Sequence, residues 1–346
     1  MASITPIPLP GKLVTFGEVM MRLSPPLNYR FVQARELDIT YGGGEANVSV
    51  SLARLGLPAE HVTVFPDHEL GQAAAQHLRQ QGVSLAHTVF RGHRLGLYFL
   101  ESGASVRASH IVYDRADSAF ANLQADWFDW ETILTGVGWL HWTGITPAIS
   151  AQAAAATAAA IQAARRLGIT VSADVNYRRN LWQYGQRAQD VMPPLVAGCD
   201  IVVCAENDAE DLFGIATGPH SNDSFAQMAA QLLDRFPGIK QVITTRRDTL
   251  SASHNQLRGL LYDQTGITTE TPTYDIVPIV DRIGGGDAFM AGFIYGTHTY
   301  ATAEEALRCG VAASVLKHSI HGDANLATRS EIEAVMAGDT AGRLLR

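Results

Sequence analysis

The chain has 346 residues, of which 47% are hydrophobic, and a formal net charge of −8. This length is enough for one large core, or for a main domain with a smaller second one. A negative chain offers no broad basic surface, so we expect no nucleic-acid partner. Any anionic ligand must instead be met by locally placed arginines.

Three cysteines, Cys199, Cys204 and Cys309, show no CxxC spacing, which is typical of buried thiols in a reducing compartment. Met1 to Gly11 lacks the charged start and apolar run of a secretory signal. Ala151 to Ala164 is apolar only through its alanines and is too short for a membrane span. These features predict a cytoplasmic protein with no membrane partner.

The first predicted element is a buried strand, Lys12 to Phe16. Met20 to Tyr41 then combines mixed alternation with a Pro-Pro pair, which indicates extended strands outside the main sheet. A glycine cluster at 42–44 leads into an amphipathic helix predicted over Ala46 to Leu55, and Gly56 stops it.

Beyond this helix a pattern repeats, in which a helix ends at a glycine and a run rich in Val, Ile or Thr follows. Such alternation predicts an α/β fold with a mainly parallel sheet wrapped by helices. Ligands of these sheets bind beyond the carboxyl ends of the strands, which places Asp174 to Asn176 and Glu206 with Asn207 on the functional edge. The predicted strands are His61–Phe65, His87–Phe90, Ile169–Asp174, Asp200–Cys204 and Lys240–Thr245.

Leu95 to Tyr113 breaks this rhythm because it alternates with no helix between its halves. Together with Met20 to Thr40 it could form a small antiparallel sheet, which we interpret as a lid built from two separated pieces of chain. The alternative is a pair of hairpins that extends the main sheet. The glycines at 42–44 would serve as the hinge of the lid.

The lid has more apolar surface than a small exposed sheet can leave in water. Only one of its two faces can cover a substrate, so we expect a homodimer or a larger symmetric oligomer joined lid to lid. The apolar residues that favour this association are Leu95, Leu97, Phe99 and Ile111.

Near the carboxyl terminus, Asp281 precedes three glycines, Gly284 to Gly286, and a second acid, Asp287. The glycines allow a turn whose N–H groups point inward, and the helix predicted from Ala288 to about Gly296 adds the positive end of its dipole. Such a nest can hold a phosphoryl group while Asp287 takes a proton from a hydroxyl. The alternative is a structural turn with Asp287 as an N-cap.

The two glycine clusters, in this order and at opposite ends of the chain, resemble the signatures of the PfkB family of carbohydrate kinases, from Lys12 to about Leu326. The resemblance implies a ribokinase-like three-layer α/β/α sandwich over residues 11–338, with a mainly parallel central sheet and a discontinuous β lid at about 19–41 and 93–116. The finer features most resemble the 2-keto-3-deoxygluconate kinases. They are Tyr98–Glu101, Tyr113–Arg115, Gly144–Thr146, Asp174–Arg178 with Leu181 and Trp182, and Lys317–Asp323.

The chain also departs from the family pattern. Arg282 stands where Thr is usual, and Gly285 stands where Ala is usual. The nucleotide-side loop, Thr245 to Ser251, lacks the glycines that this loop often carries. After the first strand, the position of a hydroxyl-binding Asp is met by Glu18 and Arg22, which counts against a simple pentose or hexose.

The resemblance makes Asp287 the general base for the primary hydroxyl of the sugar. Gly284, Gly285 and Gly286 would hold the moving γ-phosphoryl group through their N–H groups. The implied substrate residues are Gly43, Gly44, Asn47, Tyr98, Tyr113, Arg115, Ile145 and Arg178.

The resemblance implies ATP and Mg²⁺ as cofactors, with ADP over Thr244 to Ser251 and Lys317 to Asn325. The implied nucleotide residues are Asn207, Thr244, Thr245, Arg246, Gly286 and Asn325. Asn207 and Glu210, which share one side of a helical turn, would hold Mg²⁺ through water; an N-cap role for Asn207 is compatible with this. Asp281 and the backbone near Ile283 match positions where some relatives hold a monovalent cation, although Arg282, which lies between them, could supply that charge itself.

Arg115 and Arg178 choose the class of substrate. An arginine fork matches a carboxylate in a bidentate way, so the pair favours a keto sugar acid such as 2-keto-3-deoxygluconate. One alternative is a kinase for a neutral ketose such as fructose, and another is a sugar-binding sensor without catalysis. The configuration at C4 of the sugar acid stays open.

Overall fold

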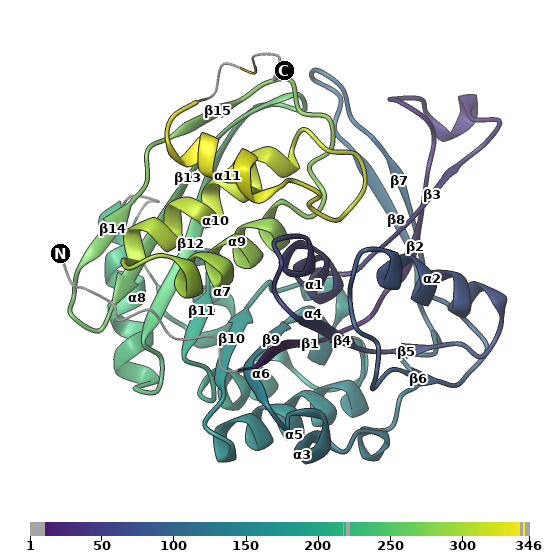
Figure 1. Ribbon diagram of the computed structural model, residues 1–346, viewed down its shortest axis with the longest axis horizontal. Helices are drawn as coiled ribbons and strands as arrows, with labels where there is room; N and C mark the ends of the chain where they lie inside the picture. The colour runs from purple at the N-terminus through teal and green to yellow at the C-terminus, as the bar shows by residue number, and fades with distance from the viewer. Residues whose placement is uncertain (1–10, 217, 219–221, 340–341, 343–346) are drawn as a thin grey trace.

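The computed structural model describes residues 11–216, 218, 222–339 and 342 (Figure 1). Their main sheet has nine strands in the order β14-β13-β12-β11-β10-β9-β1-β4, and β15 pairs with β13. Six neighbouring strands of this sheet run parallel to one another: β12, β11, β10, β9, β1 and β4. β13 runs antiparallel to each of its partners, β12, β14 and β15. Their bounds are β1 Lys12–Phe16, β4 Ala59–Val62, β9 Val137–Thr143, β10 Thr170–Asp174, β11 Ile201–Val203, β12 Gln241–Ser251, β13 His254–Asp263, β14 Thr268–Glu270 and β15 Tyr274–Ile276.

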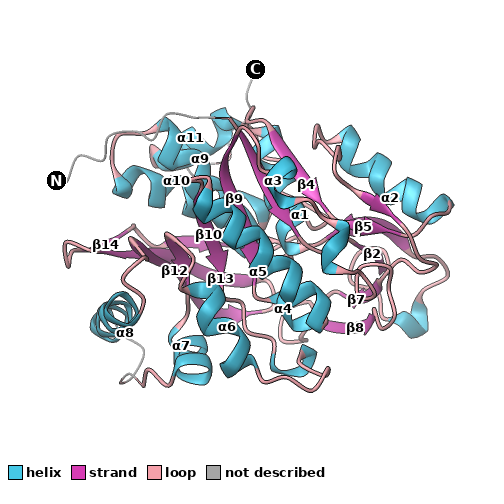
Figure 2. Cartoon of the chain, turned by 90° about the horizontal axis from the view of Figure 1, so that it is seen from below, coloured by secondary structure: helices cyan, strands magenta, loops and turns pink. Residues whose placement is uncertain are grey.

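Helices cover both faces of this sheet, which gives three layers (Figure 2). One layer of side chains packs below the sheet around Trp142 and Phe225, and the other packs above it around Phe289 and Leu307. The first layer is contributed by α3 Trp130–Ile133, α5 Ala151–Arg166, α6 Ala188–Val196, α7 Glu206–Phe213 and α8 Asn222–Arg235. The second is contributed by α1 Gly44–Arg54, α9 Gly285–Thr299, α10 Ala303–Lys317 and α11 Arg329–Met336. The three-layer, mainly parallel fold is therefore confirmed.

A separate four-stranded sheet, called the small sheet below, projects from the body (Figure 1). Its order is β3-β2-β7-β8, from β2 Met20–Ser24, β3 Asp38–Gly42, β7 Leu97–Glu101 and β8 His110–Asp114. It is built from two separated pieces of chain and does not extend the main sheet. The expectation of an antiparallel sheet is wrong for its centre, because β2 and β7 are parallel. Both strands run outward from the body, so their directions agree.

The base of the small sheet rests on α1 and on α2 Glu69–Gln80. Met21 and the half-buried Leu97 lie in this contact, together with Leu78 of α2. Beside it, β5 Val64–Phe65 pairs with β6 Val89–Phe90 in a two-stranded sheet. The predicted strand His87–Phe90 therefore forms outside the main sheet.

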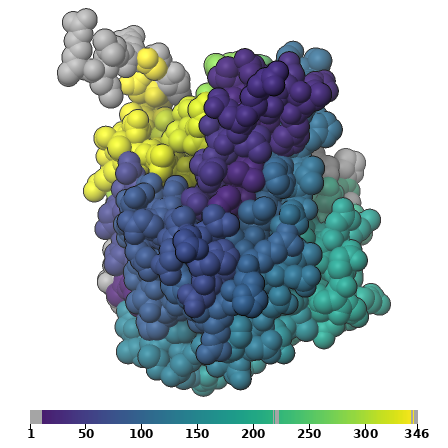
Figure 3. All heavy atoms as spheres, turned by 90° about the vertical axis from the view of Figure 1, so that its right-hand side faces the viewer, coloured from purple at the N-terminus to yellow at the C-terminus, as the bar shows by residue number. Residues whose placement is uncertain are grey.

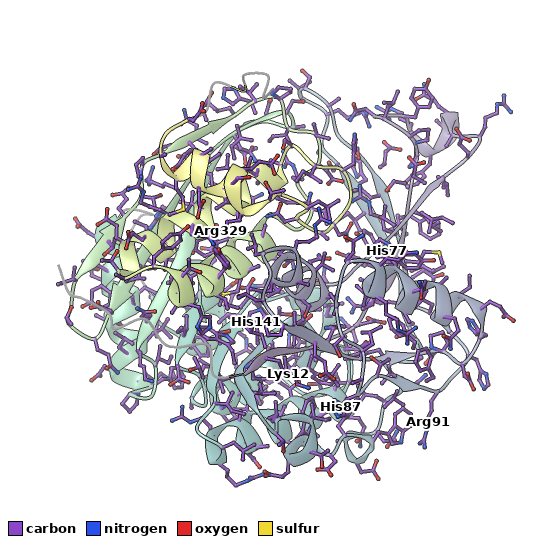
Figure 4. All side chains as sticks on the ribbon, in the orientation of Figure 1. Lys12, His77, His87, Arg91, His141 and Arg329 are labelled. Carbon is purple, nitrogen blue, oxygen red and sulfur yellow. The ribbon has the colours of Figure 1, made fainter. Side chains whose placement is uncertain are left out.

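At the edge of the main sheet, Glu60 on β4 is fully buried. Lys12 and His87, both labelled in Figure 4, bind different oxygens of this carboxylate: Lys12 Nζ contacts Oε2, and His87 Nδ1 lies 2.6 Å from Oε1. Burial would raise the pKa of Glu60, but hydrogen bonds from Lys12 and His87 lower it below its ordinary value. Two distant segments are thereby joined to β4. Among the described residues, no helix combines the length and the apolar character that crossing a bilayer requires.

Two local predictions are corrected. Thr245 to Ser251 continues β12 and pairs with β13, so it is strand rather than loop. Asp287 is not an N-cap, because α9 begins at Gly285 and is capped by Gly284. Gly284 has φ = 78°, and a Cβ there would lie 1.8 Å from the Asp323 carbonyl oxygen. Only glycine fits this position.

The contact between α9 and α10 depends on small residues. A Cβ on Gly292 would lie 2.8 Å from the Cys309 carbonyl oxygen and 2.8 Å from Ala313 Cβ. Gly286, in the same helix, has no atom within 4 Å of its ideal Cβ.

We therefore expect Gly292→Ala to lower the free energy of unfolding by about 1–3 kcal/mol, because the helices must separate. The matched control Gly286→Ala should leave stability unchanged or raise it by up to about 1 kcal/mol, since alanine favours a helix. Thermal unfolding of both variants measures this. Equal melting temperatures would contradict the packing argument.

Candidate active site

The candidate site lies where the parallel strands β9 to β12 end and the helices α1, α7 and α9 begin. In open α/β sheets, ligands bind at this edge. The peptide between Val175 and Asn176 follows β10, and Asn176 has φ = 36°. The sequence predicts that Asp174 to Asn176 lie at the carboxyl-terminal edge of the parallel sheet. The other elements of the site meet at this same edge.

The first turn of α9 forms an anion hole. Gly285, Gly286 and Asp287 carry N–H groups with no backbone acceptor among the described residues, while Ala288 N–H donates to the Gly284 carbonyl at 2.8 Å. These N–H groups and the helix dipole favour a negative charge at this place. Ser314 Oγ donates to the Gly285 carbonyl at 2.8 Å, which ties the turn to α10.

Asp287 lies on the inner side of this turn and faces α1. Asn47 Nδ2 donates to Asp287 Oδ2 at 2.7 Å, and a Cβ on Gly44 would lie 3.6 Å from Asp287 Oδ1. Burial raises the pKa of Asp287 to about 8, and nearby Asp174 and Glu45 act in the same direction. A carboxylate with such a pKa is a capable base for a hydroxyl near neutral pH.

Glu45 forms the floor beside Asp287. Its Oε1 accepts hydrogen bonds from Thr143 N–H at 3.0 Å, Thr143 Oγ1 at 2.9 Å and Thr146 Oγ1 at 2.7 Å. Burial raises the pKa of Glu45, although these bonds oppose the shift. The side chain therefore joins the start of α1 to the end of β9.

An acidic pair lies at the ends of β10 and β11. Burial raises the pKa of Asp174 to about 7, with Asp208 as the second cause, and burial raises the pKa of Asp208 to about 6. A cation would relieve this pair, so the donor set fits Mg²⁺ held through water and nucleotide phosphates. Asn207 and Glu210 are exposed on the first turns of α7. No cluster of three or more potential metal ligands occurs among the described residues.

The two arginines of the substrate prediction differ in their surroundings. Arg178 is exposed and lies close enough to Asp174 and Asp208 to oppose the rise of their pKa values. Its guanidinium makes no hydrogen bond with the described residues, although its backbone carbonyl accepts from Leu181 N–H at 2.9 Å. Arg115 is already paired, because its Nε donates to Glu18 Oε2 at 2.9 Å and its Nη2 contacts the same oxygen. The structure shows no contact between Arg115 and Arg178.

The remaining substrate candidates lie on the small sheet and at the starts of α1 and α4. Tyr98 is buried and donates to Asp323, while Tyr113, opposite it in the sheet, is 54% exposed with its ring 6.0 Å away. Gly43 caps α1, and the half-buried Ile145 begins α4 Ile145–Ile149 at the end of β9.

The nucleotide candidates are partly engaged in the fold. Arg246 pairs with Glu206, and Asn325 is buried with its Nδ2 donating to the Ala313 carbonyl at 3.4 Å. Thr244 is buried on β12, and Thr245 is half-buried beside it.

Three charged residues are central to the site although the sequence assigned them no role there: Arg22, Asp208 and Asp323. Arg22 bridges Asp281 and Asp323, and its distances to their carboxylates are 2.7 and 2.9 Å. The expectation that Arg282 supplies the charge beside Asp281 is wrong, because Arg282 Nη2 donates to the Ala252 carbonyl at 2.9 Å. Only Glu18 and Arg22 after the first strand gave a signal, since charges there are unusual. Asp323 was included only as the end of the segment Lys317–Asp323, and Asp208 gave no signal.

The raised pKa of Asp287 predicts how stability depends on pH. Its carboxyl favours the protonated form in the fold, so the associated stability is complete below about pH 4 and is lost as pH rises through about 8. Asp287→Asn keeps a neutral side chain at every pH. We expect it to raise the melting temperature by about 2 °C or more at pH 8.5, with a smaller gain at pH 5.

The same variant should lower turnover by about 10²–10⁴-fold if Asp287 is the base. In the unaltered protein, kcat/KM for the acceptor should rise with pH and level off above about pH 8. Equal melting temperatures at both pH values would refute the charge conflict, and near-normal turnover would remove Asp287 from the chemistry.

With this geometry established, comparisons with known proteins identify relatives over nearly the whole chain. The model of the pfkB family of carbohydrate kinases matches residues 11–329. A 2-dehydro-3-deoxygalactonokinase of Haloferax volcanii is 33% identical over 332 residues, which cover 96% of this chain and 98% of the relative.

Solved structures agree. The crystal structure of a 2-dehydro-3-deoxygluconokinase from Thermotoga maritima superimposes with a TM-score of 0.91 at 40% identity, covering 95% of this chain and 100% of the other. A PfkB family carbohydrate kinase from Listeria grayi gives a TM-score of 0.88 at 37% identity, with 94% and 99% covered. The match of family model, sequence and three-layer fold over the same residues shows that this chain belongs to the PfkB family of carbohydrate kinases.

Proposed function

We propose that this protein transfers the γ-phosphoryl group of ATP to the 6-hydroxyl of 2-keto-3-deoxygluconate. The observation that carries the proposal is the pairing of the anion hole, formed by the free N–H groups of Gly285, Gly286 and Asp287, with the Asp287 carboxylate in one helical turn. Two of the relatives described above, from Thermotoga maritima and Haloferax volcanii, are named as kinases of 2-keto-3-deoxy sugar acids. The two names refer to sugar acids that differ in configuration at C4. We choose the gluconate form because the Thermotoga maritima relative is 40% identical to this chain and the Haloferax volcanii relative 33%.

In this proposal, each part of the site has one role. Asp287 takes the proton of the sugar hydroxyl, and Asn47 orients its carboxylate through the 2.7 Å hydrogen bond. The N–H groups at the start of α9 hold the phosphoryl oxygens under attack. The proposed Mg²⁺, near Asp174 and Asp208, would neutralise charge on the phosphates.

The proposed nucleotide lies along the body side of this turn. Thr244 and Thr245 end the parallel part of β12, and Asn207, Arg246 and Asn325 flank that edge. Arg246 and Asn325 are held by Glu206 and by backbone groups, so their role would be to shape the site. The exposed Asn207 and Glu210 would reach Mg²⁺ through water.

A carboxylate-bearing substrate is supported chiefly by Arg178. Its guanidinium is exposed at the site and has no hydrogen-bond partner within the described residues, so an incoming acid group can bind one of its edges through two parallel hydrogen bonds. Arg115 keeps Nη1 available, while Nε and Nη2 are engaged by Glu18. We therefore assign the main acid contact to Arg178 and a supporting one to Arg115.

Two alternatives are separated by a single assay. A kinase for a neutral ketose would phosphorylate fructose as well as the keto acid, and a sensor would release no ADP with either. The assay measures ADP formed with 2-keto-3-deoxygluconate, 2-keto-3-deoxygalactonate, fructose and ribose.

We expect kcat/KM for the keto acids to exceed that for fructose by about 10²–10⁴-fold, because a site built around a required polar partner rejects analogues lacking it. Arg178→Gln should lower kcat/KM for the acid by about 10–100-fold, which corresponds to about 1.5–3 kcal/mol for a charged hydrogen bond, and leave fructose nearly unchanged.

The matched control is Arg179→Gln. Arg179 is the next residue, is also exposed, and pairs with Asp211 at 3.1 Å, so its loss should not alter selectivity. Arg115→Gln is a poorer test because it would leave the buried Glu18 without its partner. Equal use of fructose and the keto acid, or unchanged selectivity in Arg178→Gln, would overturn the acid assignment.

We also propose that two copies associate through the small sheet. On its outer face, the strand register aligns Ile39, Leu23, Phe99 and Val112 in one row across all four strands. Ile39 and Val112 are 57% and 55% exposed, which leaves this apolar row open. Of the residues expected from the sequence, Leu95 is buried in the core, and Ile111 lies on the opposite face with Tyr113.

Ile39→Glu with Val112→Glu should convert the dimer into a monomer, because four desolvated carboxylates would then meet in one interface. Leu167→Glu, at a 45% exposed apolar site at the end of α5, is the control for a surface charge. Light scattering at micromolar concentration measures the mass. A monomer before mutation would refute the proposal.

A further inference from the structure

Four buried charged residues lie next to the turn that carries the anion hole. Arg22 lies on β2 of the small sheet, and Asp281, Lys317 and Asp323 come from the carboxyl-terminal part of the chain. All four residues are at most 6% exposed. Figure 3 shows the amino-terminal purple segment lying against the yellow carboxyl-terminal one, in agreement with the ion pair of Arg22 and Asp323.

Every donor nitrogen of Arg22 has an acceptor. Nε donates to Ser24 Oγ at 2.8 Å, Nη1 to Asp323 Oδ1 at 2.9 Å and Nη2 to Asp281 Oδ2 at 2.7 Å. Burial by itself would lower the pKa of Arg22, but Asp281 and Asp323 raise it above its ordinary value. Arg22 is therefore a permanent buried cation.

Each oxygen of both carboxylates is engaged as well. Asp281 Oδ1 accepts from Ile283 N–H at 3.0 Å, and its Oδ2 accepts from Gly322 N–H at 3.1 Å in addition to Arg22. The second oxygen of Asp323 accepts the Tyr98 hydroxyl. Every carboxylate oxygen in this group therefore already accepts at least one hydrogen bond within the protein.

The charges of this group also balance. Lys317 donates to the Ile320 carbonyl at 2.9 Å, and Asp281 and Asp323 partly offset the lowering of its pKa by burial. Two cations thus face two anions, and a further cation would add an uncompensated buried charge. The monovalent cation that the family resemblance places at Asp281 does not fit these residues.

The group bears directly on the anion hole. Asp281 accepts the N–H of Ile283, the residue before Gly284, and the Asp323 carbonyl sits where a Cβ of Gly284 would be. Displacing either acid would shift the turn that carries the three free N–H groups. Arg22 therefore joins the small sheet to the phosphoryl-binding turn.

We propose that Arg22 is a positioning residue that replaces a bound monovalent cation at Asp281, so that phosphoryl transfer does not depend on K⁺. The inference rests on the proposed kinase function. It assigns to Arg22 two effects that a surface ion pair would not have: it holds the anion hole, and its removal creates a site for a small cation.

The first experiment compares the unaltered protein in potassium-free buffer and in 100 mM K⁺. Product formation is read directly by chromatography, because coupling enzymes can themselves require potassium. We expect the two turnover rates to agree within about twofold. Activation by K⁺ of tenfold or more would overturn the proposal.

The second experiment uses Arg22→Ala, which leaves the two acids with Lys317 alone. We expect kcat to fall about 10²-fold with a smaller change in KM for ATP, and K⁺ or guanidinium ion to restore at least tenfold of that loss. Arg22→Lys should keep more activity and remain insensitive to K⁺. Arg107→Ala, in the connection between β7 and β8, removes an arginine paired with Glu101 at 3.0 Å and should show no rescue.

A readout independent of turnover protects the test from an incorrect substrate assignment. K⁺ or guanidinium ion should raise the melting temperature of Arg22→Ala, because an ion bound only by the folded state stabilises it, and should not raise that of the unaltered protein. If Arg22→Ala does not fold, Arg22→Met, which keeps the side-chain volume, replaces it. A variant with normal kcat and no response to either ion would refute the inference, whichever acceptor the enzyme uses.

Discussion

The start of α9 imposes the constraint on which the rest of the site depends. A single turn there holds three free N–H groups, which favour negative charge, and the carboxylate of Asp287, which burial and neighbouring acids disfavour. The turn is therefore suited to an incoming phosphoryl group and to a base that gains from accepting a proton. Asn47 donates directly to the Asp287 carboxylate and comes from α1, so two helices from opposite ends of the chain build one candidate site.

The surrounding fold keeps this turn in place by steric fit and by charge. Gly284 adopts a left-handed conformation against the Asp323 carbonyl, and the Gly285 carbonyl is held by Ser314. The buried pairs of Arg22 with Asp281 and Asp323 add an electrostatic clamp. Such pairs contribute little net stability, yet they are costly to break because a buried charge is left alone. Their contribution here is to fix geometry.

The small sheet has two different faces for the same reason. Its inner face presents Arg22 and Tyr98 to the carboxyl-terminal turn, where both are satisfied by acids. Its outer face presents the row of Ile39, Leu23, Phe99 and Val112, which no element of the described chain covers fully. A period of two along each strand sends alternate side chains to these faces.

Local patterns in the sequence determined the α/β class, the parallel strands and the helix after each glycine cluster. Periodicity and glycine placement are properties of neighbouring residues, so Lys12 to Phe16 and the helix starting near Gly285 could be read directly. The same local chemistry indicated that Asp287 stands beside a nest of N–H groups. The direction of β7 against β2 could not be read, because pairing between distant strands leaves no local pattern.

Only the tertiary structure decided which charges meet. Arg22 and Asp323 are separated by 301 positions, and Arg115 and Glu18 by 97, so no spacing rule links them. The sequence treats Arg115 and Arg178 alike, but in the structure Arg115 is paired with Glu18 whereas Arg178 is exposed. The cation that pairs with Asp281 is Arg22, whereas its sequence neighbour Arg282 donates to the Ala252 carbonyl. A charge is defined by the sequence, but its partner and its dielectric surroundings arise only when the chain folds.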